Sequence, residues 1–164
     1  MELVENGAAG GHKILVFSQF ASMLRRIAAR LDQAGISYHL LTGSTGQQER
    51  KQMVSSFGED SVRVFLISLK AGGVGLNLTA ADIVIHYDPW WNAAAQNQAT
   101  DRAHRIGQKH TVMVYQLIAR NTIEENILKL QEAKGRLASQ VVDGDPRNFA
   151  ALSREDLIRL LEGM

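Results

Sequence analysis

Several features that are common in proteins are missing from this chain of 164 residues, and each absence excludes a class of structure or function. It contains no cysteine, which excludes disulfide frameworks and cysteine metal sites and fits a reducing compartment. Its five histidines do not have His-Glu-x-x-His spacing, so no metal site is expected. No apolar run approaches the ~18 residues of a membrane span, and no secretory signal is visible. We therefore expect a cytoplasmic protein.

An excess of positive charge is also missing. The 18 Lys and Arg residues nearly cancel the 17 Asp and Glu residues, which leaves a formal net charge of +1. The sequence therefore lacks the globally basic surface that would attract nucleic acid. Any DNA contact has to come from a local arrangement of residues, and we expect the isolated chain to bind DNA weakly.

The chain alternates strand and helix patterns. The apolar run Lys13–Phe17 is typical of a strand buried on both faces, and helical periodicity follows over Gln19–Gln33 until Gly35. Further strands are expected at Ser37–Leu41, Arg63–Ile67, Ile83–Tyr87 and Val112–Leu117, and further helices at Gly46–Phe57, Asn92–Arg105 and Thr122–Gln140, the last with Thr122 as its N-terminal cap. This repetition predicts an α/β protein with a mostly parallel sheet and helices on both faces, three layers in all.

Glycine, proline and acidic residues mark the ends of this repetition. Residues 1–11 are expected to be a lead-in segment, a short helix followed by the flexible stretch Gly7–Gly11. The main domain is expected at residues 12–140. Residues 141–164 would form a tail, in which Asp143-Gly-Asp-Pro breaks the structure and Ser153–Leu161 forms a short capped helix.

The most informative stretch is Gln-Ala-Thr-Asp-Arg-Ala-His-Arg-Ile-Gly-Gln at residues 98–108. In a helix that ends at Gly107, Gln98, Arg102 and Arg105 would share one face at i, i+4 and i+7. Two adjacent guanidiniums suit a multiply charged phosphate, because each can bind two oxygens. The alternative is a solvated helix in which Asp101 pairs with Arg105.

Polar residues follow several of the expected strands. Ligands of open parallel sheets bind at the carboxyl ends of strands, and short hydroxyls and glycine amides there can donate to phosphates. The residues in question are Ser18 and Gln19, Thr42 to Ser44, Ser68 to Asn77, and Asp88 to Asn92. The alternative for Thr42-Gly-Ser is an ordinary turn. Gly72-Gly-Val-Gly does not satisfy the Gly-x-Gly-x-x-Gly dinucleotide fingerprint.

These blocks together resemble a known family. In their order and spacing, the blocks resemble motifs IV, V and VI of helicase superfamily two. They are Ile14-Leu-Val-Phe-Ser-Gln-Phe, Thr42-Gly-Ser-Thr, Ser68-Leu-Lys-Ala-Gly-Gly-Val-Gly-Leu-Asn-Leu, Asp88-Pro-Trp-Trp-Asn and, last, Asp101-Arg-Ala-His-Arg-Ile-Gly-Gln. The last block is similar to the Swi/Snf-type DNA translocases and chromatin-remodelling ATPases in particular. The resemblance covers about residues 12–140 and corresponds only to the second, C-terminal lobe of the two RecA-like lobes in that family.

The resemblance implies a role in ATP hydrolysis. Arg102 and Arg105 would be catalytic arginine fingers, and together with Gly75 and Asn77 they would lie beside the nucleotide. The cofactor would be ATP with Mg²⁺ in the intact two-lobe enzyme, held mainly by the first lobe, and none is expected on this lobe alone. The chain contains no Gly-x-x-x-x-Gly-Lys-Ser/Thr loop and no acidic magnesium box, so we expect it to be inactive by itself.

The resemblance also implies contacts with the DNA backbone. The residues carried over by position are Ser18, Gln19, Thr42, Ser44, Ser68, Lys70, Trp91 and Gln98. Two adjacent tryptophans cannot both point inward from an extended segment, so at least one of Trp90 and Trp91 should be exposed. Core or lid packing is the alternative role for these tryptophans. Ala93 stands where the family usually has proline, which leaves the rigidity of this loop open.

These implications define the expected function as the second motor lobe of an ATP-dependent translocase on double-stranded DNA. Its partners would be double-stranded DNA and the N-terminal lobe of the same protein, in the nucleoid of a bacterium or the nucleus of a eukaryote. One alternative is a free-standing α/β module that binds a phosphate ligand or nucleic acid without ATPase activity. Another is a lobe of a strand-separating helicase. The helix Thr122–Gln140 would either pack across the two lobes or complete the core of this one.

Overall fold

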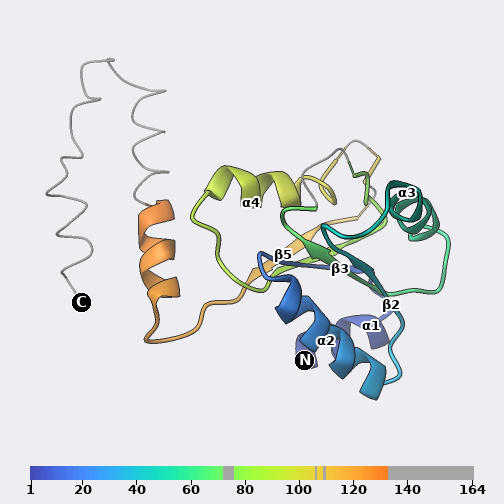
Figure 1. Ribbon diagram of the computed structural model, residues 1–164, viewed down its shortest axis with the longest axis horizontal. Coiled ribbons are helices and arrows are strands. Elements are labelled where there is room, and N and C mark those ends of the chain that lie inside the picture. Colours follow the sequence, from blue (N-terminus) through green and yellow to red (C-terminus); the bar gives the residue numbers. More distant parts are fainter. Residues whose placement is uncertain (72–75, 106, 109, 133–164) are drawn as a thin grey trace, which may run out of the picture.

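Five strands make up a single sheet in the part of the chain that the structure describes. The computed structural model describes residues 1–71, 76–105, 107–108 and 110–132 (Figure 1). Neighbouring strands are all parallel, in the order β2-β3-β1-β4-β5. The strands are β1 (Ile14–Ser18), β2 (Tyr38–Leu41), β3 (Val64–Ser68), β4 (Ile83–His86) and β5 (Met113–Gln116). The expected α/β class is confirmed.

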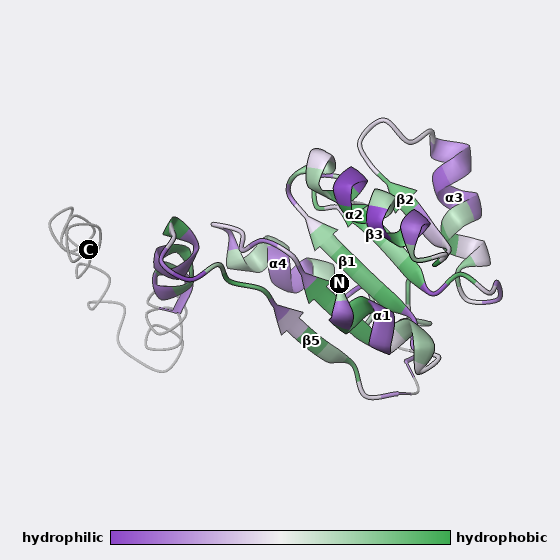
Figure 2. Ribbon diagram, turned by 90° about the horizontal axis from the view of Figure 1, so that it is seen from below, coloured by the Kyte–Doolittle hydropathy of each residue, from purple (hydrophilic) through white to green (hydrophobic). Residues whose placement is uncertain are grey.

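Helices cover both faces of this sheet. Helices α1 (Glu2–Ala9) and α2 (Ala21–Gln33) lie on one face, and α3 (Gln47–Ser56) and α4 (Ala93–Thr100) lie on the other (Figure 1). Successive side chains of a strand point to opposite faces. In β1, Ile14 and Val16 therefore join the core under α1 and α2, while Leu15 and Phe17 join the core under α3 and α4. The strands β1 and β3 are accordingly buried throughout and hydrophobic up to the serine that ends each of them (Figure 2).

The first residues of the chain belong to this core. Val4 of α1 is buried in the same cluster as Ile14 and Ile83, and Gly7 is a buried residue of the helix. A Cβ atom at Gly7 would lie 2.9 Å from Cδ1 of Ile14, so glycine lets α1 approach β1 closely. The expectation of a flexible stretch from Gly7 to Gly11 is therefore wrong at its start. Of the residues in that stretch, only Gly10 and Gly11 lie after the end of the helix.

The caps of two helices agree with the sequence. Gly35 follows α2 with φ +66°, and the amide of Ile36 donates to the carbonyl of Leu31, which is a Schellman ending. Residues 123–132 are helical, and the hydroxyl of Thr122 accepts from the amide of Glu124 as the expected cap. Residues 133–140, the expected break and the expected terminal helix lie outside the described residues. None of the described helices is long and apolar enough to span a membrane.

Helix α4 is shorter than the sequence predicts. It ends at Thr100, whereas the pattern placed the end at Arg105. Beyond Thr100 the chain turns more tightly: the Arg102 amide donates to the Ala99 carbonyl at 3.2 Å and the Ala103 amide to the Thr100 carbonyl at 3.0 Å, three residues back rather than four. The amide of Leu78 donates to the Arg102 carbonyl at 3.0 Å, and Nε2 of Gln108 donates to the Ala103 carbonyl at 3.2 Å. Tighter turns, tied to Leu78 and Gln108, therefore follow the last regular turn of the helix.

Candidate functional site

Three predicted hydroxyl residues meet at the carboxyl edge of the sheet. Ser18 of β1 lies opposite Ser68 of β3, and Thr42 directly follows Leu41, which pairs with Ile67. The parallel register thus brings the three residues together, as expected from their positions after strands. All three are buried, whereas the neighbouring predicted residues Ser44 and Lys70 are exposed, as their exposure classes along the chain indicate.

A buried carboxylate occupies the middle of this edge. Asp88, which is 6% exposed, accepts from the Ser18 hydroxyl through Oδ2 and from the Gln19 amide through Oδ1 at 2.9 Å. Nε2 of Gln19 in turn donates to the Pro89 carbonyl at 2.8 Å. The predicted residues Ser18 and Gln19 thus join the end of β1 to the loop after β4. A carboxylate that is hydrogen-bonded in this way fixes the loop in place.

The Thr42–Thr45 segment forms a turn whose hydroxyls bind each other. The Thr45 amide donates to the Thr42 carbonyl at 3.1 Å, and the Thr42 amide donates to Oγ1 of Thr45 at 3.0 Å. The hydroxyls of Thr42 and Ser44 lie 2.8 Å apart. The segment is thus a turn, as the alternative reading of the sequence predicts, and Ser44 lies at its exposed tip.

The two tryptophans point in different directions, as the sequence predicts. Trp91 is 51% exposed, whereas Trp90 packs against the core under α3 and α4. The loop then enters α4 through Asn92, whose Oδ1 accepts from the Ala94 amide at 3.0 Å and the Ala95 amide at 3.4 Å. This side chain is a helix N-cap, so the junction is ordered without the family's proline. Gln98, further along α4, is exposed.

The two arginines differ in their surroundings. Arg102 is only 8% exposed, and its guanidinium makes no hydrogen bond to any residue that the structure describes, with Nε fully enclosed. Arg105 is exposed. The expected common stripe of Gln98, Arg102 and Arg105 is therefore wrong, because α4 ends before the arginines. The Leu78–Arg102 backbone bond nevertheless brings the exposed Asn77 close to Arg102. Gly75 lies outside the described residues.

A buried histidine joins β4 to the end of α4. His86 is 1% exposed and stacks on Phe17, with 5.7 Å between ring centroids. Its Nε2 lies 2.9 Å from the hydroxyl of Thr100, which itself donates to the Gln96 carbonyl at 3.4 Å. Burial lowers the pKa of His86 from 6.5 to about 4, so the ring is neutral at pH 7. This contact holds the residue from which the Arg102 turn begins.

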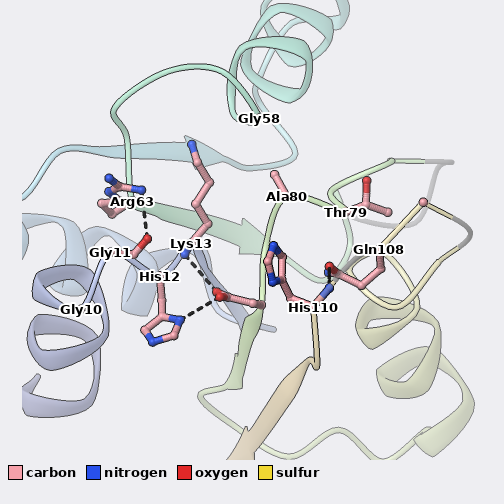
Figure 3. Close-up of a pocket in the computed structure, with 12 residues that line it drawn as sticks. Gly10, Gly11, His12, Lys13, Gly58, Arg63, Thr79, Ala80, Gln108 and His110 are labelled. Atoms are coloured by element: carbon pink, nitrogen blue, oxygen red, sulfur yellow. Dashed lines mark hydrogen bonds and ion pairs between the residues drawn. The ribbon is translucent and has the colours of Figure 1, made fainter.

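A polar cavity of about 640 Å³ lies at the opposite, amino edge of the sheet (Figure 3). His12 bonds Asp82 at 2.7 Å, and Nη1 of Arg63 donates to the Gly11 carbonyl at 3.0 Å. Gln108 donates to the Ala81 carbonyl at 2.7 Å. The described residues that line this cavity include none of the predicted site residues. Gln108, the last residue of the stretch at residues 98–108, thus connects that stretch to the residues just before β4.

Sequence reasoning missed the structural role of several residues that organise this site, although it placed the first of them at the carboxyl edge. They are Asp88, Gln96, Thr100 and Gln108. An acid directly before Pro89 at the end of an apolar strand was a signal for the first. The others act through contacts between distant parts of the chain, which spacing does not reveal. Among the described residues, no group of three or more His, Cys, Asp or Glu side chains could hold a metal ion.

Comparisons with known proteins agree with the resemblance. The sequence matches the helicase conserved C-terminal domain over residues 1–107. An uncharacterized ATP-dependent helicase of Mycoplasma pneumoniae is 44% identical over 163 residues, which is 99% of this chain and 16% of that protein. The human chromatin-remodeling ATPase INO80 is 40% identical over 152 residues, 92% of this chain and 10% of its own length. The chain thus spans a small part of these relatives.

A solved structure has the same fold. The crystal structure of the C-terminal part of the Fun30 ATPase domain has a TM-score of 0.75 and 36% sequence identity. The match covers 79% of this chain and 42% of that one. The parallel sheet between two helical layers is therefore a RecA-like α/β fold. This chain belongs to the helicase conserved C-terminal domain family, and its homologues are ATP-dependent helicases and chromatin remodellers of the Swi/Snf type.

Proposed function

We propose that this chain is the second motor lobe of an ATP-dependent translocase or remodeller that moves along double-stranded DNA. ATP with Mg²⁺ would be held mainly by the N-terminal lobe of the same protein and would supply the energy of its terminal phosphate bond. Arg102, Arg105, Gly75 and Asn77 would face that nucleotide. The working location would be the nucleoid in a bacterium and the nucleus in a eukaryote.

The observation that carries this proposal is the environment of Arg102. A buried N–H group of a guanidinium without a hydrogen-bonded partner is costly, because it has lost water and gained no acceptor in return. Arg102 is 8% exposed, and its enclosed Nε has no such partner among the described residues. A phosphate brought by another lobe would provide the missing acceptor oxygens. The exposed Arg105, three residues later, would reach the same anion from the surface.

The carboxyl edge supplies a second set of groups for this function. Ser44, Lys70, Trp91 and Gln98 are exposed and are proposed to contact the DNA backbone directly. The buried set would hold the loops that present them, and it consists of Ser18, Gln19, Thr42 and Ser68, of which Gln19 is half-buried. With a net charge of +1, this local face would have to act together with the first lobe to hold DNA firmly.

Arginine substitutions test the proposed catalytic role. In a protein that joins this chain to its N-terminal lobe, Arg102→Ala and Arg105→Ala should each lower the rate of DNA-stimulated ATP hydrolysis. The expected loss is about 10³-fold or more, because an arginine finger stabilises charge that develops in the transition state. The rate would be measured as phosphate release at saturating DNA. Arg26→Ala, an exposed position on α2, is the matched control.

The outcomes separate the competing functions. Unchanged hydrolysis in both arginine variants would show that the arginine-finger assignment is wrong. If the joined protein hydrolyses no ATP at all, the chain is better described as a binding module for phosphate ligands or nucleic acid. Strand separation of a forked duplex by an active joined protein would favour a conventional helicase over a translocase on intact duplex DNA.

A further inference from the structure

The backbone of the tryptophan loop is held by three glutamines from three separate parts of the chain. Gln19, after β1, donates to the Pro89 carbonyl at 2.8 Å. Gln96 of α4 accepts from the Trp90 amide through Oε1 at 3.3 Å. Gln131, in the helix at residues 123–132, donates from Nε2 to the Trp90 carbonyl. Three successive polar groups of the backbone therefore have a side-chain partner.

Gln96 and Gln131 also contact each other. Nε2 of Gln131 lies 3.4 Å from Oε1 of Gln96, the oxygen that accepts from the Trp90 amide. A carboxamide oxygen can accept two hydrogen bonds and an NH₂ group can donate two, so both side chains are used in full at these atoms. Gln96 is 8% exposed and Gln131 is half-buried, which limits competition by water. The two glutamines form a closed clamp on the Trp90 peptide.

We propose that this glutamine clamp (Gln96 and Gln131) positions Trp91 for contact with DNA. Trp90 is anchored in the core, and both of its backbone polar groups are held, so the direction in which Trp91 leaves the surface is set. The helix at residues 123–132 thereby controls a loop that it does not adjoin in sequence. The inference rests on the proposed function, because it assigns the exposed Trp91 to the DNA face.

Intrinsic fluorescence can test the clamp directly, because Trp90 and Trp91 are the only two tryptophans of the chain. Gln131→Leu removes both donated hydrogen bonds. We expect the half-buried Trp90 to become accessible, so that the acrylamide quenching constant rises by up to about twofold as the loop opens locally. The fluorescence anisotropy should fall at the same time. Gln33→Leu, the same change at an exposed position of α2, should alter neither quantity.

Two further variants keep the test independent of general destabilisation. Gln131→Glu preserves the size of the side chain but turns a carboxylate toward two acceptor oxygens, and it should reproduce the fluorescence change. Gln96→Leu combined with Gln131→Leu should change quenching by less than the sum of the single variants, because both act on one peptide. Far-UV circular dichroism would verify that each variant remains folded. Unchanged quenching in folded Gln131→Leu and Gln131→Glu would overturn the clamp.

DNA binding distinguishes failure of the clamp from failure of the proposed function. With a short duplex at low ionic strength, Gln131→Leu should raise Kd by about two- to tenfold, the cost of ordering one side chain on binding. The salt dependence of Kd should stay the same, because no phosphate contact is removed. If quenching changes but neither Gln131→Leu nor Trp91→Ala weakens binding, the assignment of Trp91 to DNA is wrong. If Trp91→Ala alone weakens binding, the positioning role is wrong.

Discussion

At the scale of single residues, His86 is a titratable side chain buried in the core, at 1% exposure. It is enclosed between Phe17 and Thr100, and its Nδ1 atom has no hydrogen-bond partner among those residues. Because the Thr100 hydroxyl donates to the Gln96 carbonyl, it accepts from Nε2–H of the neutral ring. A proton on Nδ1 would place a charge in the core with no acceptor, which explains why burial lowers the pKa of this ring.

This lowered pKa predicts how stability depends on pH. Between pH 6.5 and about 4 the unfolded chain binds a proton at His86 that the folded chain does not bind. The free energy of unfolding should therefore fall as pH decreases through this window, by at most about 1.4 kcal/mol per pH unit from this residue. Urea unfolding of the parent and of His86→Asn across the window measures the difference in slope.

His110→Asn is the control for this measurement, because His110 is exposed. The control should keep the slope of the parent, whereas His86→Asn should be less stable at neutral pH but depend less on pH. Equal slopes for the parent and His86→Asn would contradict a neutral buried ring at this position.

At the scale of elements, the start of α4 shows how a family proline can be absent without loss of order. Ala93 is the first residue of the helix, and Asn92 before it has extended dihedrals, φ −99° and ψ 97°. Proline is favoured at the first helical position and requires an extended residue in front of it. The capping amides belong to Ala94 and Ala95, so the Ala93 amide takes no part in the cap.

We therefore expect Ala93→Pro to stabilise the chain. The gain should be about 0.4–1 kcal/mol in the free energy of unfolding, mainly because proline restricts the unfolded chain. Ala94→Pro is the matched control and should be destabilising, since it removes an amide that donates to Asn92 at 3.0 Å. Denaturant unfolding of both variants gives the measurement. A loss of stability in Ala93→Pro equal to that in Ala94→Pro would refute this description of the junction.

At the scale of the whole molecule, the proposed DNA face is narrow and its charge is local. The formal net charge of +1 gives no long-range attraction, so binding should depend on few phosphate contacts. The exposed Lys70, two residues after the end of β3, is the candidate with a full positive charge at the carboxyl edge. Joining the chain to its first lobe should raise affinity, because both lobes would then hold one duplex.

Lys70→Ala should reduce the salt dependence of duplex binding by this joined protein. The slope of log K against log salt concentration should flatten by about one unit, since one released counterion is lost. Arg26→Ala, on the helix α2 that covers the same face of the sheet as α1, should have the same slope as the parent protein. If Lys70→Ala has the same salt dependence of binding as the parent protein, this lysine does not contact a phosphate.

The sequence by itself determined the α/β class, the five strands within one residue or so of their observed bounds, and the family. The alternation of apolar runs and helical stripes is a local property of the sequence, so it can be recognised without knowledge of the fold. The cap at Thr122 and the ending at Gly35 were readable for the same reason. The sequence also placed Ser18 and Ser68 at one edge, because both follow expected strands of a parallel sheet, whereas the register that sets them opposite each other comes from the structure.

Only the tertiary structure decided where α4 ends and which predicted residues are exposed. Beyond Thr100 the amides of Arg102 and Ala103 donate three residues back, and the Arg102 carbonyl accepts from the amide of Leu78, which is distant in the sequence. Burial of Arg102 and exposure of Arg105 follow from that turn. Hydrogen bonds between distant residues produce no periodic pattern in a sequence. The backbone groups of each partner could equally have been paired within local structure, so the sequence does not show which pairing forms.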